Sequence, residues 1–135
     1  ILKGAFVFMA DLCREITVPC EIGFMVAKSY YAGTTSSGVV KIEMDLDQDI
    51  SNYHVIIVED IIDSGFTMKE LLHMLEDKKT AEVYISSLLV KPGNLKVDLN
   101  IPYRCFDIEN EFIVGYGLDY NHEGRNLRHI YQVIE

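Results

Sequence analysis

Three carboxylates and two hydroxyls are crowded into one short stretch, VIIVEDIIDSGFT (55–67). Glu59 and Asp60 directly follow four β-branched residues, and Asp63 comes three residues after Asp60. Such a β-branched run is typical of a strand that is buried on both faces of a parallel sheet. Because ligands of these sheets bind beyond the carboxyl ends of the strands, the acids are expected at a ligand site. Carboxylates there can accept hydrogen bonds from sugar hydroxyls.

The residues after Asp63 form a candidate anion cradle. Gly65 lets the backbone approach a ligand, a helix N-terminus offers unpaired N–H groups, and Ser64 and Thr67 add hydroxyl donors. A sugar phosphate carries both the phosphate and the hydroxyls that such a site would bind. The same residues also suit a solvated acidic loop beside a helix start, and their types and spacing leave both interpretations open. A Walker-type nucleotide loop is excluded because the sequence has no GxxxxGK[ST].

A strand–helix–strand unit is predicted to position these side chains. The strand over 55–58 is followed by a helix that opens at Thr67, which has capping-box spacing to Glu70. Val83–Val90 reads as the next strand, so a right-handed parallel crossover is expected. The apolar face of the helix is formed by Met68, Leu71, Leu72 and Leu75.

The flanking sequence predicts the remaining elements. Apolar residues at helical spacing indicate a helix over 4–15, and alternation indicates a strand over Cys20–Val26. The small, polar stretch Ser29–Gly38 reads as a mobile loop, and with the strand Val39–Leu46 it forms a long hairpin. Short strands are expected at 103–106, 112–114 and 130–134. The predicted fold is α/β: a central, mostly parallel sheet flanked by helices, in a single domain over 1–135 with a hairpin carrying the mobile loop.

Composition and charge narrow the function classes. The chain has 135 residues, of which 49% are hydrophobic and 24% charged, as in ordinary globular domains. No apolar run approaches the roughly 20 residues of a membrane helix. The net charge of −9 argues against nucleic acid as a partner. A phosphate-rich substrate would need a local positive source, such as a metal ion, a lysine or backbone N–H groups.

The cysteines and the first residues suggest the setting of the chain. Cys13, Cys20 and Cys105 show no zinc spacing and are odd in number, which fits a reducing cytoplasm without a disulfide framework. Cys13 and Cys20 are predicted to be small buried apolar residues. Because the chain opens Ile1-Leu2-Lys3 without Met, we expect it to lack an N-terminal segment that includes most of a first strand.

The stretch EDIIDSGFT (59–67) resembles the phosphoribosyl-pyrophosphate motif of type I phosphoribosyltransferases. Further segments, in matching order, resemble the hypoxanthine or hypoxanthine-guanine branch of that family, and its bacterial members in particular. They are a pyrophosphate loop at Leu2–Gly4, the start of the active-site loop at Lys28–Tyr30, purine-binding segments at Leu89–Lys91 and Glu111–Asn121, and a pyrophosphate-contacting Arg125. Phe66 departs from the lysine that is common at its position in animal members.

The resemblance implies a purine-salvage reaction in which a 6-oxopurine displaces pyrophosphate from phosphoribosyl pyrophosphate and gives IMP or GMP. It implies Mg²⁺ as cofactor, Asp63 as the general base, and a cis peptide before Lys3. It also implies a homodimer or homotetramer in the cytoplasm, with no nucleic acid or membrane partner. The implied phosphoribosyl-pyrophosphate ligands are Lys3, Gly4, Ser29, Tyr30, Glu59, Asp60, Asp63, Ser64, Gly65, Phe66, Thr67 and Arg125. The implied purine-binding residues are Lys91, Phe112, Ile113 and Asp119, and the implied metal ligands are Glu59, Asp60 and Asp119.

Three alternatives remain at this point. A xanthine-preferring relative would use the same chemistry, although Lys91 and the segment FIVGYGLDYN (112–121) favour the hypoxanthine branch. A regulator that senses nucleotides on the same fold, possibly through RNA, would be favoured by a basic surface, which a charge of −9 opposes. A phosphoacceptor receiver domain would explain the acid pair, but not the SGFT cradle (64–67) or the Lys28–Tyr30 segment.

Overall fold

The computed structural model describes residues 1–30 and 39–134 of the chain. A parallel sheet at its centre consists of β3 (His54–Ile62), β4 (Glu82–Val90) and β5 (Tyr103–Asp107), in the order β3-β4-β5. The helix α2 (Phe66–Glu76) connects β3 to β4, so the predicted parallel crossover is confirmed.

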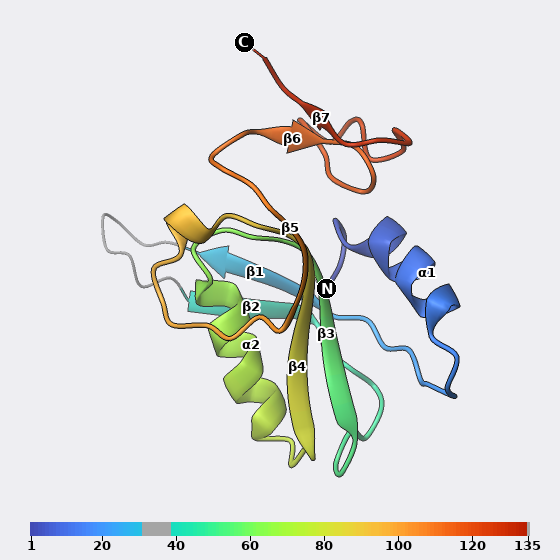
Figure 1. The fold of residues 1–135 in the computed structure, drawn as a ribbon. Helices are drawn as coiled ribbons and strands as arrows, with labels where there is room; N and C mark the ends of the chain where they lie inside the picture. Colours follow the sequence, from blue (N-terminus) through green and yellow to red (C-terminus); the bar gives the residue numbers. More distant parts are fainter. Residues whose placement is uncertain (31–38, 135) are drawn as a thin grey trace.

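An antiparallel hairpin lies beside this sheet (Figure 1). It consists of β1 (Val26–Tyr30) and β2 (Val39–Met44), close to the predicted hairpin. Most of the predicted mobile loop, residues 31–38, lies outside the described residues.

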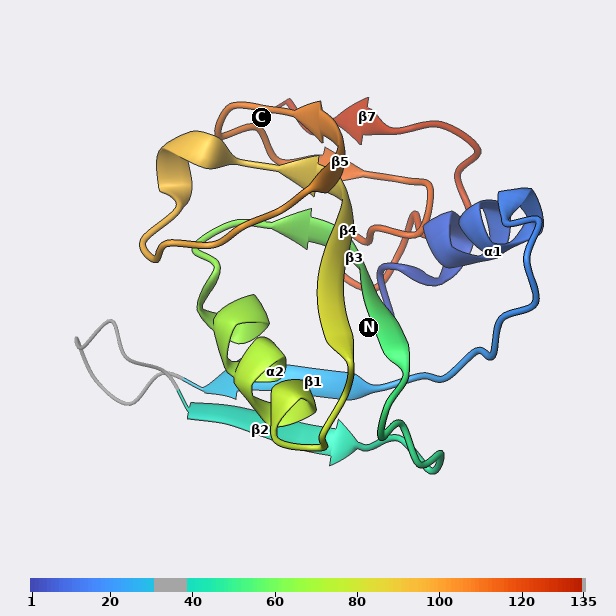
Figure 2. The same cartoon turned by 60° about the horizontal axis from the view of Figure 1, so that its bottom comes forward.

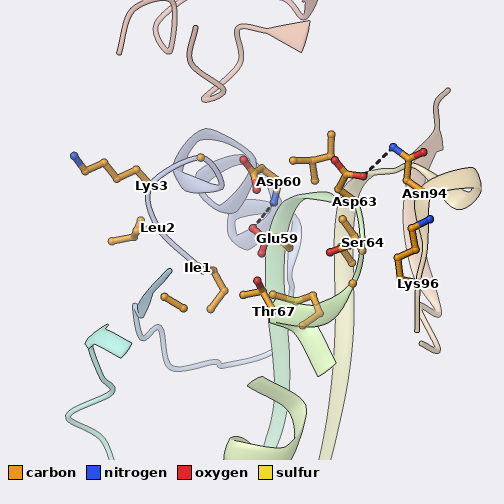
Figure 3. Close-up of a pocket in the computed structure, with 16 residues that line it drawn as sticks. Ile1, Leu2, Lys3, Glu59, Asp60, Asp63, Ser64, Thr67, Asn94 and Lys96 are labelled. Carbon is orange, nitrogen blue, oxygen red and sulfur yellow. Dashed lines mark hydrogen bonds between the residues drawn. The ribbon is translucent and has the colours of Figure 1, made fainter. Parts of the chain in front are cut away.

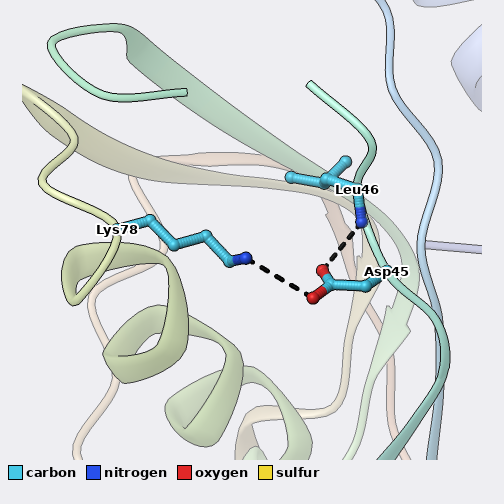
Figure 4. Close-up of polar contacts among 3 residues, drawn as sticks. All are labelled: Asp45, Leu46 and Lys78. Atoms are coloured by element: carbon cyan, nitrogen blue, oxygen red, sulfur yellow. Dashed lines mark hydrogen bonds and ion pairs between the residues drawn. The ribbon is translucent and has the colours of Figure 1, made fainter. Parts of the chain in front are cut away.

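Asp45 follows β2, and its carboxylate accepts from Leu46 N at 2.7 Å and pairs with Lys78 Nζ at 3.4 Å (Figure 4). This exposed ion pair links the end of the hairpin to the turn after α2, and exposed pairs add at most about 1 kcal/mol to stability.

The two faces of β3 carry separate apolar clusters, because side chains alternate between the faces of a strand. On one face, Val55 and Ile57 pack with Leu71 and Leu75 of α2. On the other face, Val58 packs with Phe8 of α1 (Phe6–Glu15). The helices α1 and α2 accordingly lie on opposite sides of the sheet (Figures 1 and 2).

The remaining elements lie at the end of the molecule where β3 and β4 terminate (Figures 1 and 2). A short 3₁₀ turn, η1 (Pro92–Asn94), follows β4. Two-residue strands, β6 (Ile113–Val114) and β7 (Tyr131–Gln132), pair antiparallel, and together with β5 they confirm all three short strands that were expected. None of the helices in the described residues has the length and apolar character needed to cross a bilayer.

Three local predictions were wrong. The predicted strand over Cys20–Val26 begins only at Val26, because the preceding residues find no neighbouring strand with which to pair. Cys20 is exposed instead of buried, while Cys13 is half-buried. The capping box is absent: the N-cap of α2 is Gly65, no side chain caps it, and Thr67 lies inside the first turn.

Candidate active site

A cavity of about 630 Å³ opens at the carboxyl end of β3 (Figure 3). Three segments that are distant in the sequence meet there: the first four residues of the chain, the β3–α2 connection, and the turn after β4. Of the predicted site residues, the cavity is lined by Lys3, Gly4, Glu59, Asp60, Asp63, Ser64, Gly65 and Thr67. The anion cradle and the three carboxylates therefore face one space.

Glu59 and Asp60 form the deepest acidic part of this cavity. Glu59 is only 9% exposed, and its Oε1 accepts a hydrogen bond from Asp60 N at 3.0 Å. Burial raises the pKa of Glu59 well above its usual value, the side-chain hydrogen bond and negative charge of Asp60 raise it further, and the backbone hydrogen bond from Asp60 N lowers it. Because a buried carboxylate is costly without a cation, this pair suits a ligand that brings positive charge or donors.

The loop Leu2–Gly4 closes over Asp60. Leu2 N donates to Met25 O at 2.8 Å, and the peptide between Leu2 and Lys3 is cis, as expected for this loop. A Cβ on Gly4 would lie 1.8 Å from Asp60 Oδ2, so a larger residue at this position would force the carboxylate to move. Lys3 is exposed beside this contact and lines the cavity, and its side chain points away from the acids (Figure 3).

The cradle after Asp63 depends on Gly65. Gly65 has a φ of 88°, in the left-handed region, and the chain turns there from β3 into α2. Thr67 Oγ1 forms a short hydrogen bond with Ser29 Oγ, which joins the start of the predicted active-site loop to the cradle. The first-turn N–H groups of α2 and the hydroxyls of Ser64 and Thr67 are together suited to a phosphate.

Lys91 lies beside the acids through strand register. In the β3–β4 ladder Ile62 pairs with Val90, so Asp63 and Lys91 leave neighbouring strands at the same level. Lys91 N donates to Ile62 O at 2.9 Å, and the residue is 9% exposed. A buried lysine at this edge can direct its ammonium at a hydrogen-bond acceptor.

The purine-segment residues Phe112 and Asp119 do not line the cavity. Phe112 is 58% exposed and makes an edge contact with Tyr120, with ring centroids 5.5 Å apart. Asp119 pairs with Arg125 at 3.4 Å and accepts from His122 N at 3.0 Å. The segment is nevertheless close to the cavity, because a Cβ on Gly117 would lie 2.4 Å from Gly4 O. Ser29, Phe66, Lys91, Ile113 and Arg125 likewise lie outside the cavity lining, and the predicted contact of the Tyr30 side chain falls outside what the structure describes.

The predicted metal ligands do not form a preassembled cage. Within the described ranges 1–30 and 39–134, no three His, Cys, Asp or Glu side chains gather as a metal site. Carboxylate oxygens from Glu59 and Asp60 at the cavity are still of the kind that Mg²⁺ prefers. Mg²⁺ usually binds one or two carboxylates and completes its shell with water and substrate phosphate.

Two polar residues of the cavity were missed in the sequence. Asn94 Nδ2 donates to Asp63 Oδ1 at 2.9 Å (Figure 3), and Lys96 N donates to Ser64 O at 2.9 Å. Both residues line the cavity. Their position shortly after the end of β4 was the available signal, since ligands bind beyond the carboxyl ends of strands.

Comparisons with known proteins agree with this geometry. The phosphoribosyl transferase domain family matches residues 1–121. The hypoxanthine-guanine phosphoribosyltransferase of Streptococcus pneumoniae is 49% identical over 130 residues, which are 96% of this chain and 72% of that protein. The hypoxanthine phosphoribosyltransferase of Haemophilus influenzae is 44% identical over 134 residues, 99% of this chain and 75% of that protein. The crystal structure of a Staphylococcus aureus hypoxanthine phosphoribosyltransferase superposes with a TM-score of 0.94 at 41% identity, covering 98% of this chain and 72% of that one.

Proposed function

This chain belongs to the phosphoribosyltransferase family, and we propose that it transfers the phosphoribosyl group of phosphoribosyl pyrophosphate to hypoxanthine or guanine. The products would be IMP or GMP and pyrophosphate, in purine salvage. The observation that carries this proposal is that the acid pair Glu59 and Asp60 and the cradle at 64–67 line the same cavity. The substrate has a matching pair of features, ribose hydroxyls and phosphates.

In the proposed reaction the site residues bind the substrate, remove a proton from the purine and stabilise the leaving group. Glu59 and Asp60 accept hydrogen bonds from the ribose hydroxyls, and the cradle holds the 5′-phosphate through N–H and hydroxyl donors. Asp63 removes the imidazole N–H proton of the purine, and the freed nitrogen attacks the anomeric carbon. The bond from that carbon to the pyrophosphate oxygen breaks, and the leaving group takes the electron pair. Lys3 and Arg125 stabilise the charge on the leaving pyrophosphate.

Mg²⁺ is part of the proposal. Glu59, Asp60 and Asp119 would supply oxygen ligands to the metal. To bind it, Asp119 would have to give up its ion pair with Arg125. When bound, the metal neutralises pyrophosphate charge. With a net charge of −9, the chain otherwise repels such a substrate.

Pyrophosphate release on mixing the protein, Mg²⁺, phosphoribosyl pyrophosphate and one purine at a time tests the proposal. Release with hypoxanthine or guanine supports it, and release with xanthine alone would favour a xanthine-preferring enzyme. If no purine gives release while the protein still binds nucleotides, it is a nucleotide-sensing regulator instead. We also infer a dimer or tetramer in the cytoplasm, and analytical ultracentrifugation would test the assembly.

A further inference from the structure

We propose that Asn94 is a positioning residue that holds the carboxylate of Asp63 for proton abstraction, an inference that rests on the proposed function. Asp63 is exposed at the end of β3, so its side chain would rotate freely without a partner. Asn94 Nδ2 donates to Asp63 Oδ1 at 2.9 Å (Figure 3). This hydrogen bond joins the candidate base to the turn that follows β4.

The amide of Asn94 is itself held in place. The same Nδ2 donates to Asn110 Oδ1 at 3.1 Å, so both of its N–H groups have an acceptor. An amide that donates to two acceptors on separate segments has a defined orientation, and it presents one N–H to the carboxylate. Asn94 N also donates to Lys91 O at 3.0 Å, which closes the turn on which the side chain stands.

Backbone hydrogen bonds fix the two segments on either side of this contact. Lys91 N donates to Ile62 O and Lys96 N donates to Ser64 O, each at 2.9 Å. The acceptors are the residues immediately before and after Asp63. The segment that carries Asn94 is therefore bonded to both neighbours of Asp63. These two backbone hydrogen bonds fix the distance between the side chains of Asn94 and Asp63.

The contact leaves one carboxylate oxygen available for chemistry. Among the described residues, no hydrogen bond is made to Asp63 Oδ2. With Oδ1 held by Asn94, Oδ2 is the oxygen that accepts the purine N–H proton. An amide does not ionise near neutral pH, so Asn94 orients the base without competing for that proton. Positioning of this kind lowers the barrier by keeping the reacting atoms in a near-attack arrangement.

The test is a double-mutant cycle measured by single-turnover kinetics, which isolate the chemical step from product release. Asn94→Ala removes a hydrogen bond to a charged carboxylate. The free energy of such a bond corresponds to a slowing of the chemical step by roughly 10- to 100-fold. The KM values for both substrates should change by less than about threefold, because no binding contact is removed. In an Asp63→Asn background, Asn94→Ala should add almost nothing, since Asn94 acts through the carboxylate.

Two further variants separate positioning from loop stability. Asn110→Ala removes the second contact of the same amide without touching Asp63, so its single-turnover rate should fall between those of wild type and Asn94→Ala. Asn94→Asp has nearly the same shape but no donor, so it should be at least as slow as Asn94→Ala even if the alanine variant folds poorly. An unchanged single-turnover rate in Asn94→Ala, or full additivity with Asp63→Asn, overturns this inference while the proposed function stands. A wild-type protein that releases no pyrophosphate overturns both.

Discussion

Gly4 and Asp60 approach so closely that a single added methyl group on Gly4 would overlap the Asp60 carboxylate. The position of a Cβ there is 1.8 Å from Asp60 Oδ2 and 2.7 Å from its Cγ. The two residues are 56 positions apart, yet the loop at the start of the chain shapes the acidic end of the cavity. Gly117 also contacts this loop, through Gly4 O.

Gly4→Ala should therefore displace the Asp60 carboxylate and weaken the binding of phosphoribosyl pyrophosphate. A lost charge-assisted hydrogen bond predicts a rise in its KM of about tenfold or more. Gly93→Ala is the matched control, because a Cβ on Gly93 meets nothing within 4 Å. Steady-state kinetics on both variants give the comparison, and equal KM values in the two would contradict a role for the Gly4–Asp60 contact.

Asp63→Asn should reduce the single-turnover rate by roughly 10²- to 10⁴-fold, the usual contribution of a general base. The substitution keeps the shape of the side chain but removes its capacity to accept a proton at neutral pH. Substrate binding should change little. A single-turnover rate equal to that of wild type would assign proton removal to another group.

Catalysis should require a divalent cation, because pyrophosphate must enter a cavity that contains three carboxylates. Excess chelator is expected to abolish turnover, and added Mg²⁺ should restore it. Circular dichroism during chelation would show that the fold persists. Sustained turnover in excess chelator would rule out the metal requirement.

Lys91 should determine selectivity for 6-oxopurines. An ammonium donates to the 6-carbonyl of hypoxanthine but meets the amino group of adenine donor to donor, which can cost up to about 10⁴-fold in kcat/KM. Lys91→Met retains most of the buried volume and Lys91→Ala does not, so the pair separates charge from packing. Both variants should lose hypoxanthine use and keep the affinity for phosphoribosyl pyrophosphate. Efficient adenine turnover by wild type would place the selectivity elsewhere.

Glu59 should make the ligand-free protein less stable as the pH rises. Its pKa is raised above the usual 4.5, first by burial and then by Asp60, so the folded state holds this proton more tightly than the unfolded state. Its contribution to stability is full below pH 4.5 and is lost as the pH rises through the raised value. Glu59→Gln should thus raise Tm near neutral pH, with a smaller gain at pH 4, whereas Glu82→Gln, on an exposed side chain, should change Tm little. An unchanged Tm difference across this range would contradict the shift.

The sequence by itself determined the crossover, the fold class and the family. The β-branched run at 55–58, the apolar face of α2 and the strand at 83–90 are local patterns, and local patterns predict elements well. The motif at 59–67 carried the family resemblance because its residues act within one continuous turn. The roles assigned to its side chains remain predictions.

The tertiary structure alone decided the contacts between distant segments. The Gly4–Asp60 approach and the Asn94–Asp63 hydrogen bond join residues 56 and 31 positions apart, and no spacing rule encodes such pairs. It also decided where the patterns failed. Alternation over 20–26 suited a strand, but a strand forms only where a neighbour supplies its hydrogen-bond partners, and that partner, β2, begins to pair at Val26. Likewise Thr67 has the residue type of an N-cap, but the left-handed turn at Gly65 starts the helix earlier and leaves its hydroxyl to Ser29.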